Sequence, residues 1–294
     1  MGRGERGLGL AGWVFLSPWF LAFLVFGLFP IGYSFFLSFH EYSPLAPDRL
    51  QFLGFANYAR AFGDPTFWTA LRNTLVFTFG TLPFTTALAL ALAVCLDKAF
   101  PGRTIYRAGF FLPTVVSVVV LALVFKGLYA PDGVLNGLLQ LLGLTPPSWL
   151  LDPRTALPAI MLMDVWAASG YYMIIFLAGL KAIPEELYES AALDGAGGWQ
   201  RFRRITLPLL KPTFLFVLVV NSVRSLQIFT EVFVMTRGGP LDSTLTAVYY
   251  LYEEAFYRFR LGYASAVAYI LFGLTLLLAV VQVRWLKLSG ARDA

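Results

Sequence analysis

The sequence predicts an all-α integral membrane protein with six membrane-spanning helices, and three observations support this fold class. The 294-residue chain is 58% hydrophobic and only 13% charged, about half the charged fraction of an average soluble domain. Its apolar residues are gathered into long blocks, and a helix needs roughly 20 such residues to cross the hydrocarbon core of a bilayer. Within the blocks the apolar residues are continuous and do not alternate with polar ones, which argues against a membrane β-barrel.

The six apolar blocks define the expected spans in chain order. They cover approximately residues 13–39, 73–96, 106–128, 156–180, 208–233 and 261–285 of a single membrane domain at residues 1–294. The first block is too long for the apolar core of a cleaved signal peptide, so we expect it to remain as a span. Asp164 interrupts the apolar run of the fourth block, and Arg224 interrupts that of the fifth.

The lysines and arginines of the connecting segments predict the orientation. Thirteen lie in the two terminal tails, the connection between the second and third spans (98–107) and the connection between the fourth and fifth spans (181–211), whereas eight lie in the remaining connections. The cytoplasmic loops of membrane proteins carry the excess of positive charge. We therefore expect both termini and the 181–207 loop to face the cytoplasm.

Composition also excludes several classes of site. The single cysteine, Cys95, cannot form a disulfide within the chain, and the single histidine, His40, excludes a metal site built from several histidines. The net charge is +5, but the basic residues lie at the ends of the apolar blocks and do not form one patch, so no nucleic-acid partner is expected. We expect neither a metal nor a cofactor.

The 181–207 loop is expected to form two short helices on the membrane face. Pro184 suits the first turn of a helix, and the acidic pair at 185–186 suits the positive end of the helix dipole. Gly195 can adopt the left-handed conformation that ends a helix. A second short helix is expected from Trp199 to about Ile205, and Pro208 is expected to begin the next span. The small residues of this loop would let another protein approach closely.

Residues 189–208 carry the pattern E-S-A-x₃-G-x₉-I-x-L-P, which resembles the signature loop of binding-protein-dependent ABC importer permeases. The resemblance implies a coupling helix that docks into a cleft of a cytoplasmic ATPase. The family usually has alanine where this chain has Ser190. The resemblance assigns coupling to Glu189, Ser190, Ala191, Ala192, Asp194, Gly195 and Ala196. The residues alone leave an alternative open, an amphipathic helix that lies on the membrane without a partner.

Other stretches extend the resemblance over nearly the whole chain. FANYARAF, FWTALRNTLVFT, VLNGLLQLLGL, MTRGGP and GYASA resemble the carbohydrate-uptake branch of these permeases, the type that imports maltose, trehalose and glycerol phosphate. This implies the type I importer permease fold in a bacterial or archaeal inner (plasma) membrane. The implied partners are a second homologous permease, two cytoplasmic ATPase subunits, an extracytoplasmic sugar-binding protein and the lipid bilayer.

The chain carries no motif for ATP binding. A G-x-x-x-x-G-K-[ST] phosphate loop is absent from the sequence, and with it the backbone cradle and the lysine that hold the phosphates. We therefore expect a transport subunit and not an enzyme, with hydrolysis on a separate partner subunit.

The two charges inside the spans are expected to lie at similar depth. Asp164 is about nine residues from the outer start of its span, and Arg224 is about six residues from the outer end of its own, which differ by roughly one helical turn. A charge in hydrocarbon costs about 2.5–3.5 kcal/mol on insertion scales. We expect both side chains to line one polar cavity, where they can pair.

Polar, small and aromatic residues surround this pair on both spans. Asn221, Arg224, Ser225 and Ile228 recur on one face of the fifth span. The resemblance places substrate contacts at Asp164, Ala167, Ala168 and Tyr171 and at Asn221, Ser225 and Ile228. Such a mixture suits sugars, because carboxylates and amides bond hydroxyl pairs while aromatic faces cover the ring. The alternatives are a purely structural ion pair, hydrogen bonds between helices and ordinary aromatic packing.

These observations predict the permease subunit of an ATP-driven sugar importer, which forms half of the translocation pathway and couples ATPase motion to alternating access. One rival is an importer of the same architecture for another solute, such as glycerol phosphate, where Arg224 would suit the phosphate. A rival of a different class is an ion-driven secondary carrier or channel, which would need no signature loop and often shows inverted repeats with broken helices.

Overall fold

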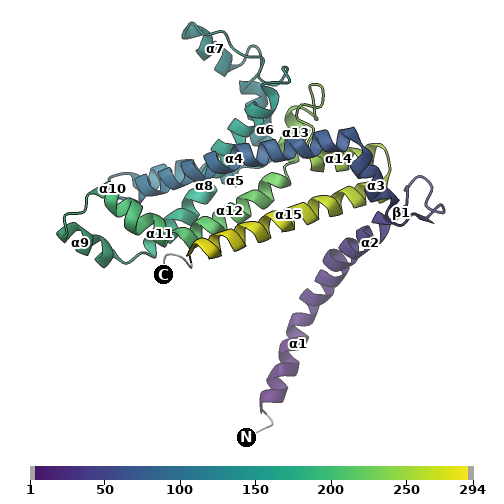
Figure 1. Ribbon diagram of the computed structural model, residues 1–294, viewed down its shortest axis with the longest axis horizontal. Coiled ribbons are helices and arrows are strands. Elements are labelled where there is room, and N and C mark those ends of the chain that lie inside the picture. The colour runs from purple at the N-terminus through teal and green to yellow at the C-terminus, as the bar shows by residue number, and fades with distance from the viewer. Residues whose placement is uncertain (1–3, 291–294) are drawn as a thin grey trace. The chain divides into compact units, whose positions relative to one another are not determined.

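A computed structural model describes residues 4–290 of the chain, and the side chains of residues 12–284. The chain forms two compact units, Met1–Asp64 with Leu251–Ile270 and Pro65–Tyr250 with Leu271–Ala294. Helices make up nearly all regular structure in the described part (Figure 1). The single domain expected at residues 1–294 stays a prediction. Residues 1–3 and 291–294 lie outside the described residues, and with them Arg3 and Arg292, two of the basic residues counted in the terminal tails.

Five helical segments within residues 4–290 are long and apolar enough to cross a membrane, and a sixth is obtained if a bent pair forms one span. The five are Gly12–Ser38, Pro65–Asp97, Ala156–Lys181, Lys211–Met235 and Leu261–Arg284. The bent pair is α5 (Arg103–Val115) and α6 (Val118–Leu128). These segments agree with the expected number of spans, although the second begins earlier than the sequence indicated.

The third expected span, residues 106–128, is not one continuous helix. Helices α5 and α6 meet at an angle of 99°, because Val116 and Ser117 have extended backbones with ψ angles of 141° and 133°. Pro113 lies in the last turn of α5, where its missing N–H and its ring weaken the helix that leads into the break. Hydropathy alone registers the length of such a segment and not its bend.

The smaller unit begins with α1 (Gly4–Phe23), which continues through a π-helical turn, η1 (Leu24–Leu28), into α2 (Phe29–Ser38). A short antiparallel pair follows, β1 (His40–Glu41) with β2 (Gln51–Phe52), and then α3 (Ala56–Gly63). Asn57 connects α3 to the end of α2 and to β1, because its Nδ2 donates hydrogen bonds to the carbonyls of Ser38 and His40 at 3.0 Å each. A Cβ at Gly262 would collide with the His40 carbonyl, so the backbones approach closely there. The unit is completed by η3 (Glu253–Tyr257) and the start of α15 (Leu261–Gly290).

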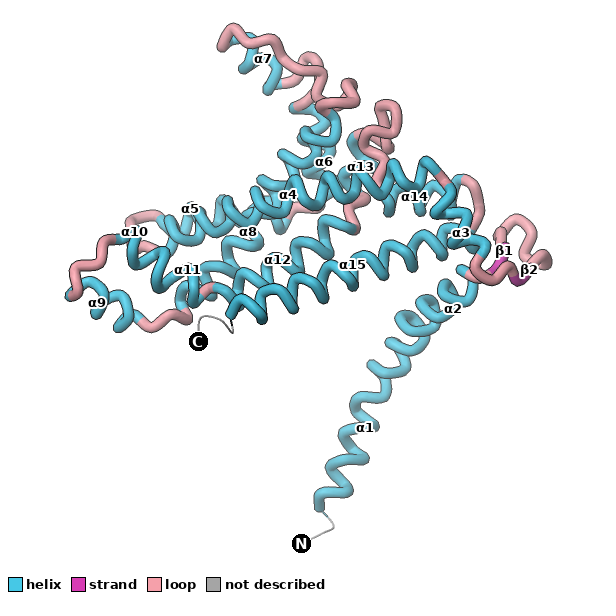
Figure 2. Tube along the Cα trace, in the orientation of Figure 1, coloured by secondary structure: helices cyan, strands magenta, loops and turns pink. Residues whose placement is uncertain are grey.

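The larger unit is built around three helices that lie side by side, α4 (Pro65–Asp97), α8 (Ala156–Lys181) and α12 (Lys211–Leu226) (Figure 2). Its buried core contains alanines of α4, larger side chains of α8 and α12, and Leu210 just before α12. Its members include Ala89, Ala93, Tyr172, Met173, Phe176, Leu210 and Val217. Helix α5 crosses α8 at Gly170, where a Cβ would collide with the backbone carbonyl of Phe110. Small residues at such crossings let helices pack tightly in lipid.

The two ends of these three helices carry the shorter elements of the larger unit (Figure 1). At one end lie α9 (Glu185–Leu193), α10 (Gly198–Arg201), the π-helical turn η2 (Phe202–Thr206) and α11 (Leu207–Leu209). Towards the other end lie α6, α7 (Val134–Leu141), α13 (Thr230–Met235) and α14 (Ala247–Tyr252). The two ends of the three-helix core therefore carry different sets of short helices.

The fifth expected span, residues 208–233, is interrupted near one end. Helix α12 stops at Leu226 and α13 starts at Thr230, so residues 227–229 form a non-helical link. The span also begins later than expected, because η2 and α11 occupy residues 202–209. The interruption places Arg224 just before the link and Glu231 just after it.

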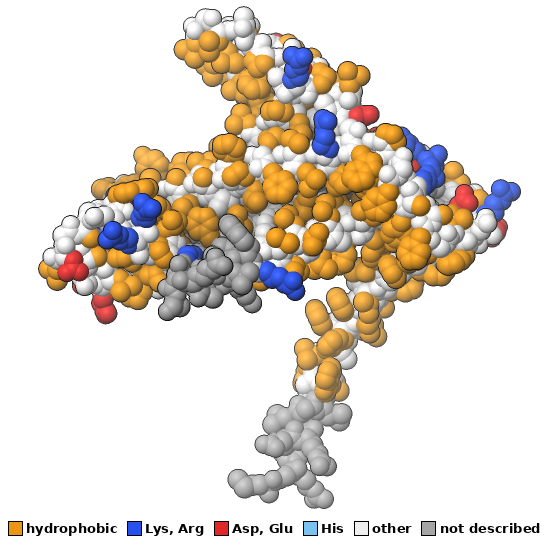
Figure 3. All heavy atoms as spheres, in the orientation of Figure 1, with side chains coloured by type: hydrophobic (Ala, Val, Ile, Leu, Met, Phe, Trp, Pro, Cys, Tyr) orange, Lys and Arg blue, Asp and Glu red, His pale blue; other side chains and the backbone are white. Residues whose placement is uncertain are grey.

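Large apolar side chains are exposed on both units, including Phe15, Phe26, Ile105 and Leu112. The space-filling view shows hydrophobic side chains over much of the visible face, with charged groups concentrated towards the loops (Figure 3). Exposed apolar surface on this scale is unfavourable in water. It is the surface expected of helices that face lipid.

Candidate functional site

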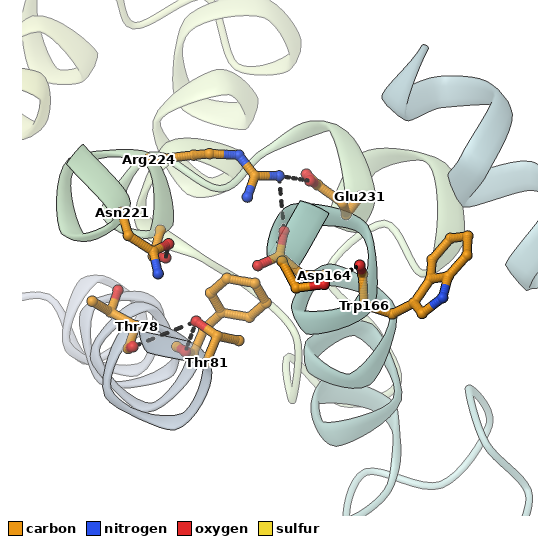
Figure 4. A network of polar contacts seen from close by, with 10 residues as sticks. Thr78, Thr81, Asp164, Trp166, Asn221, Arg224 and Glu231 are labelled. Carbon is orange, nitrogen blue, oxygen red and sulfur yellow. Dashed lines mark hydrogen bonds and ion pairs between the residues drawn. The ribbon is translucent and has the colours of Figure 1, made fainter. Parts of the chain in front are cut away.

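Three charged residues meet where α8, α12 and α13 come together. The Arg224 Nη2 lies 2.9 Å from Asp164 Oδ1, and the same nitrogen lies 3.8 Å from Glu231 Oε1 (Figure 4). The pairing of Asp164 with Arg224, expected from their depths in the spans, is confirmed. Glu231 was not named as a site residue, although it lies within the fifth expected span at residues 208–233. Its position seven residues after Arg224, on the same face of a continuous helix, was the signal available in the sequence.

The carboxylates of this charged cluster are buried, whereas its guanidinium is open on one side. The side chains of Asp164 and Glu231 are 4% and 9% exposed, and that of Arg224 is 40% exposed. A buried charge requires a partner, since removal from water costs several kcal/mol per ion. Arg224 supplies that partner to both carboxylates.

Two adjoining hollows border the charged cluster. The first encloses about 190 Å³ and is lined by Asp164, Arg224, Ser225, Gln227, Ile228 and Glu231, with Phe77, Val118, Phe229 and Thr230. The second encloses about 260 Å³ and is lined by Ala167, Ala168, Tyr171, Tyr172 and Arg224, with residues from the break between α5 and α6. Val118 and Arg224 line both. All the pathway residues named from the sequence, except Asn221, therefore line one hollow or the other; their roles stay predictions.

Asn221 lines neither of these two hollows. Its side chain is fully buried, its Oδ1 accepts a hydrogen bond of 3.4 Å from Ser225 Oγ, and it lies beside the α4 helix that carries Thr78 and Thr81 (Figure 4). The hydroxyls of the two threonines donate hydrogen bonds to backbone carbonyls of their own helix. The expected polar stripe of α12 is thus divided, with Arg224 facing the hollows and Asn221 facing α4. The hydrogen bond of Asn221 stays within α12, so hydrogen bonding between helices at this residue stays a prediction.

A larger hollow of about 720 Å³ lies at the loop end of α6, bordered by residues of the 126–151 segment and of the 235–240 turn. Trp149 Nε1 donates to Asn136 Oδ1 at 2.7 Å, and the Trp149 ring stacks on Tyr129 with centroids 5.1 Å apart. The Tyr129 hydroxyl donates to the Ala159 carbonyl, and burial raises the pKa of Tyr129 to about 12. The phenol therefore keeps the proton it donates throughout the neutral range.

The expected coupling loop forms a helix, a turn and a second helical segment. Helix α9 follows Pro184, which caps it instead of occupying its first turn, and Asp194 ends it. Gly195 has a φ of +78°, the left-handed conformation expected from the sequence. The second helix was expected at 199–205; α10 starts at Gly198 and passes into η2.

Helix α9 buries none of its residues, and the loop around it exposes large apolar side chains. Leu193 is 91% exposed and Trp199 is 72% exposed. A side-chain hydrogen bond joins α9 to the segment that leads back to α12, with the Tyr188 hydroxyl oxygen 2.9 Å from Thr206 Oγ1. Neither residue was named from the sequence, because a bond between positions eighteen residues apart leaves no local pattern.

Residues 96–287 match the family described as binding-protein-dependent transport system inner membrane component. The chain is 38% identical to the probable ABC transporter permease protein YesP of Bacillus subtilis, over 92% of this chain and 88% of that protein. It is 37% identical to the lactose transport system permease protein LacF of Rhizobium radiobacter, over 98% of this chain and 96% of that protein.

A solved structure of a bacterial ABC transporter gives a fold of the same kind. It is the alginate transporter in complex with an alginate pentasaccharide-bound periplasmic protein, and one of its chains superposes with a TM-score of 0.82 at 25% identity. The superposition covers 95% of this chain and 93% of that chain. The all-helical importer permease fold expected from the signature loop is therefore confirmed.

Proposed function

Because the chain belongs to the family of binding-protein-dependent transport system inner membrane components, we propose that it is the sugar-conducting permease subunit of an ATP-driven importer. It is a multi-pass membrane protein, and its relatives are named as permease proteins. Lactose is the solute named for one of the two relatives described above, and a saccharide-bound periplasmic protein accompanies the solved neighbour. A sugar is therefore the substrate class that we assign.

The observation that carries the proposal is the connection between the exposed loop and the charged cluster. The 182–210 segment joins α8 to α12 directly, and these helices carry Asp164 and Arg224. A force applied to α9 is therefore delivered to the two helices that border the hollows. Such a two-ended element can convert motion at one site into rearrangement at another.

The proposed mechanism assigns one task to each part. Two ATPase subunits on the cytoplasmic side close on ATP and move the loop of residues 181–207. A second homologous permease completes the pathway, and an extracytoplasmic binding protein delivers the sugar when the hollows open outward. Opening of the ATPases then returns the helices and releases the sugar inward. Both termini of the chain face the cytoplasm in this arrangement.

The docking surface of the loop has the chemistry that the mechanism requires. Leu193 and Trp199 are exposed apolar residues, and tryptophan is among the residue types that contribute most to the energy of protein interfaces. The small residues Ser190, Ala191 and Ala196 leave the backbone accessible between them. Glu189 and Asp194 add charge at the rim.

The family places the chain in a binding-protein-dependent system, which does not favour an ion-driven carrier or channel. Affinity purification of the tagged chain from its own host membranes tests the proposal, followed by labelled lactose uptake in vesicles loaded with ATP. We expect an ATPase subunit, a second permease and a sugar-binding protein to associate, and uptake to require ATP. Uptake of sugar that continues without ATP and follows an ion gradient would overturn the proposal.

A further inference from the structure

The charged cluster of Asp164, Arg224 and Glu231 supplies no unpaired positive charge to the hollows. We propose that this cluster makes the part of the pathway lined by this chain selective for uncharged sugars over anionic solutes, with Glu231 as a specificity-determining residue. The inference rests on the proposed function, since it names the substrate class of that pathway. It also decides against glycerol phosphate, which Arg224 would suit if it were free.

The geometry assigns Arg224 to the protein's own carboxylates. One nitrogen, Nη2, is 2.9 Å from Asp164 Oδ1 and 3.8 Å from Glu231 Oε1. With both carboxylates ionised, the cluster has a formal charge of −1. With one of them protonated, the cluster is neutral. In both states the guanidinium is compensated, so a phosphate or carboxylate from solution has no free cation to meet.

Among the residues described around the two hollows, Arg224 is the only basic one, so no second cation is available to an anion. Asp164, Arg224 and Glu231 are the charged side chains among the residues found around the two hollows. Lys126, at the end of α6, donates its Nζ to the Val234 carbonyl at 3.2 Å and borders the larger loop hollow instead. In both charge states this segment therefore offers an anion no uncompensated cation, which disfavours an anion relative to an uncharged sugar.

The remaining polar lining suits hydroxyl groups. Thr114, Tyr171, Ser225, Gln227 and Thr230 are uncharged and border the hollows. Hydroxyls and amides both donate and accept hydrogen bonds, which matches the paired character of sugar hydroxyls. An anion that displaced a carboxylate from Arg224 would leave that carboxylate buried without a partner, a strongly unfavourable exchange.

Glu231 decides the sign of the local charge. Asp164 and Arg224 form the closer pair and balance each other, so the excess negative charge comes from Glu231. It lies on α13, beyond the interruption of the fifth span, and its side chain is buried. Replacement by glutamine keeps the shape of the side chain and removes the excess charge, whereas replacement by aspartate keeps the charge.

The test measures the electrostatic potential in the hollow with charged thiol reagents. Cys95 is the sole cysteine, so a Cys95→Ala background is free of thiols. Gln227→Cys places a reporter at an exposed residue of the first hollow, and Leu141→Cys places a matched reporter on α7, which carries no charged residue. The assembled importer is treated with the cationic trimethylammonium-ethyl and the anionic sulfonatoethyl methanethiosulfonates, and both reaction rates are measured at each reporter.

We expect the cation-to-anion rate ratio to be larger at the Gln227→Cys reporter than at the Leu141→Cys reporter. Glu231→Gln should lower the rate of the cationic reagent and raise that of the anionic reagent at position 227, by severalfold each, because it removes a negative charge that lines the same hollow. Glu231→Asp should leave the ratio high. A ratio at position 227 equal to or below that at position 141 overturns the inference, and this comparison needs no substitution of Glu231.

A second arm separates this inference from the proposed function. Uptake of lactose and of its acid, lactobionate, is compared in the same vesicles, with the same binding protein, for the unchanged chain and for Glu231→Gln. The inference expects Glu231→Gln to raise lactobionate uptake relative to lactose by severalfold, and an unchanged relative uptake overturns it. If neither lactose nor lactobionate enters although the reagents report a cation-preferring hollow, lactose import is refuted and the electrostatic assignment stands.

Discussion

Tyr188 and Thr206 connect the two arms of the exposed loop, with the Tyr188 hydroxyl oxygen 2.9 Å from Thr206 Oγ1. Thr206 is buried, whereas α9 buries none of its residues. The bond therefore connects a helix without buried residues to the segment that leads into α12. We interpret it as the strut through which motion of α9 reaches the charged cluster.

Tyr188→Phe removes this hydrogen bond and keeps the aromatic ring. A hydrogen bond contributes roughly 1 kcal/mol, about a fivefold change in the equilibrium between the bonded and the separated arms of the loop, so we expect less sugar to be transported per ATP hydrolysed. The ratio of uptake to phosphate release in proteoliposomes measures it. Thr206→Ser keeps a hydroxyl and should behave like the unchanged chain, and Tyr257→Phe, at a residue 61% exposed, is the matched control. An unaltered ratio in Tyr188→Phe would show that the strut transmits nothing.

Arg224→Leu should destabilise the protein strongly. It leaves Asp164 and Glu231 buried without their common partner, and removal of one member of a buried pair costs about 3–5 kcal/mol. We expect a lower thermal unfolding midpoint in detergent and reduced accumulation in the membrane. Adding Asp164→Asn and Glu231→Gln to Arg224→Leu should recover much of the loss. If the single variant retains both its level and its sugar uptake, the charged cluster has neither a structural nor a transport role.

Gly170→Ala should disturb the crossing of α5 and α8. The added Cβ collides with the backbone carbonyl of Phe110, which cannot turn aside as a side chain can, and overpacking costs about 1–3 kcal/mol. The matched control is Gly137→Ala on α7, where a Cβ meets nothing within 4 Å and alanine favours the helix. Thermal unfolding should separate the two variants, and equal midpoints would contradict the close approach.

Gly195→Ala should weaken attachment of the ATPase. The φ of +78° at Gly195 is unfavourable for alanine by roughly 1–2 kcal/mol, so the turn that presents α9 would rearrange. Gly198→Ala is the control, since that glycine has neither a positive φ nor a neighbour within 4 Å of its Cβ position. Co-purification of the ATPase should fall about tenfold for the first variant and stay unchanged for the second. Equal recovery from both variants would mean that the left-handed turn is not required.

The sequence predicted the features that are governed by local rules. Block length and hydropathy located the spans, Gly195 marked the end of α9, and the similar depths of Asp164 and Arg224 predicted their pairing. Each of these depends on spacing along one helix or on insertion depth, which the chain displays directly. The signature pattern added the family, which the comparisons confirmed.

Features that depend on tertiary packing were not visible in the sequence. The bend after Val115 and the interruption after Leu226 are backbone breaks inside apolar stretches, and composition does not register them. Glu231 differs from these breaks, because its spacing of seven residues from Arg224 was visible in the sequence and was not used. The direction of Asn221 depends on which face of α12 meets α4, and the Tyr188 bond joins two separate turns of the loop.

Crosslinking at Ala192 tests the central claim that α9 is the docking element of this permease. A photoactivatable thiol crosslinker is attached at Ala192→Cys in the Cys95→Ala chain, within native membranes, and Leu141→Cys on α7 provides the comparison. We predict that the Ala192→Cys reporter captures a nucleotide-hydrolysing subunit and that the Leu141→Cys reporter does not. Capture of no ATPase from Ala192→Cys, in membranes that still import the sugar in an ATP-dependent manner, would contradict the account.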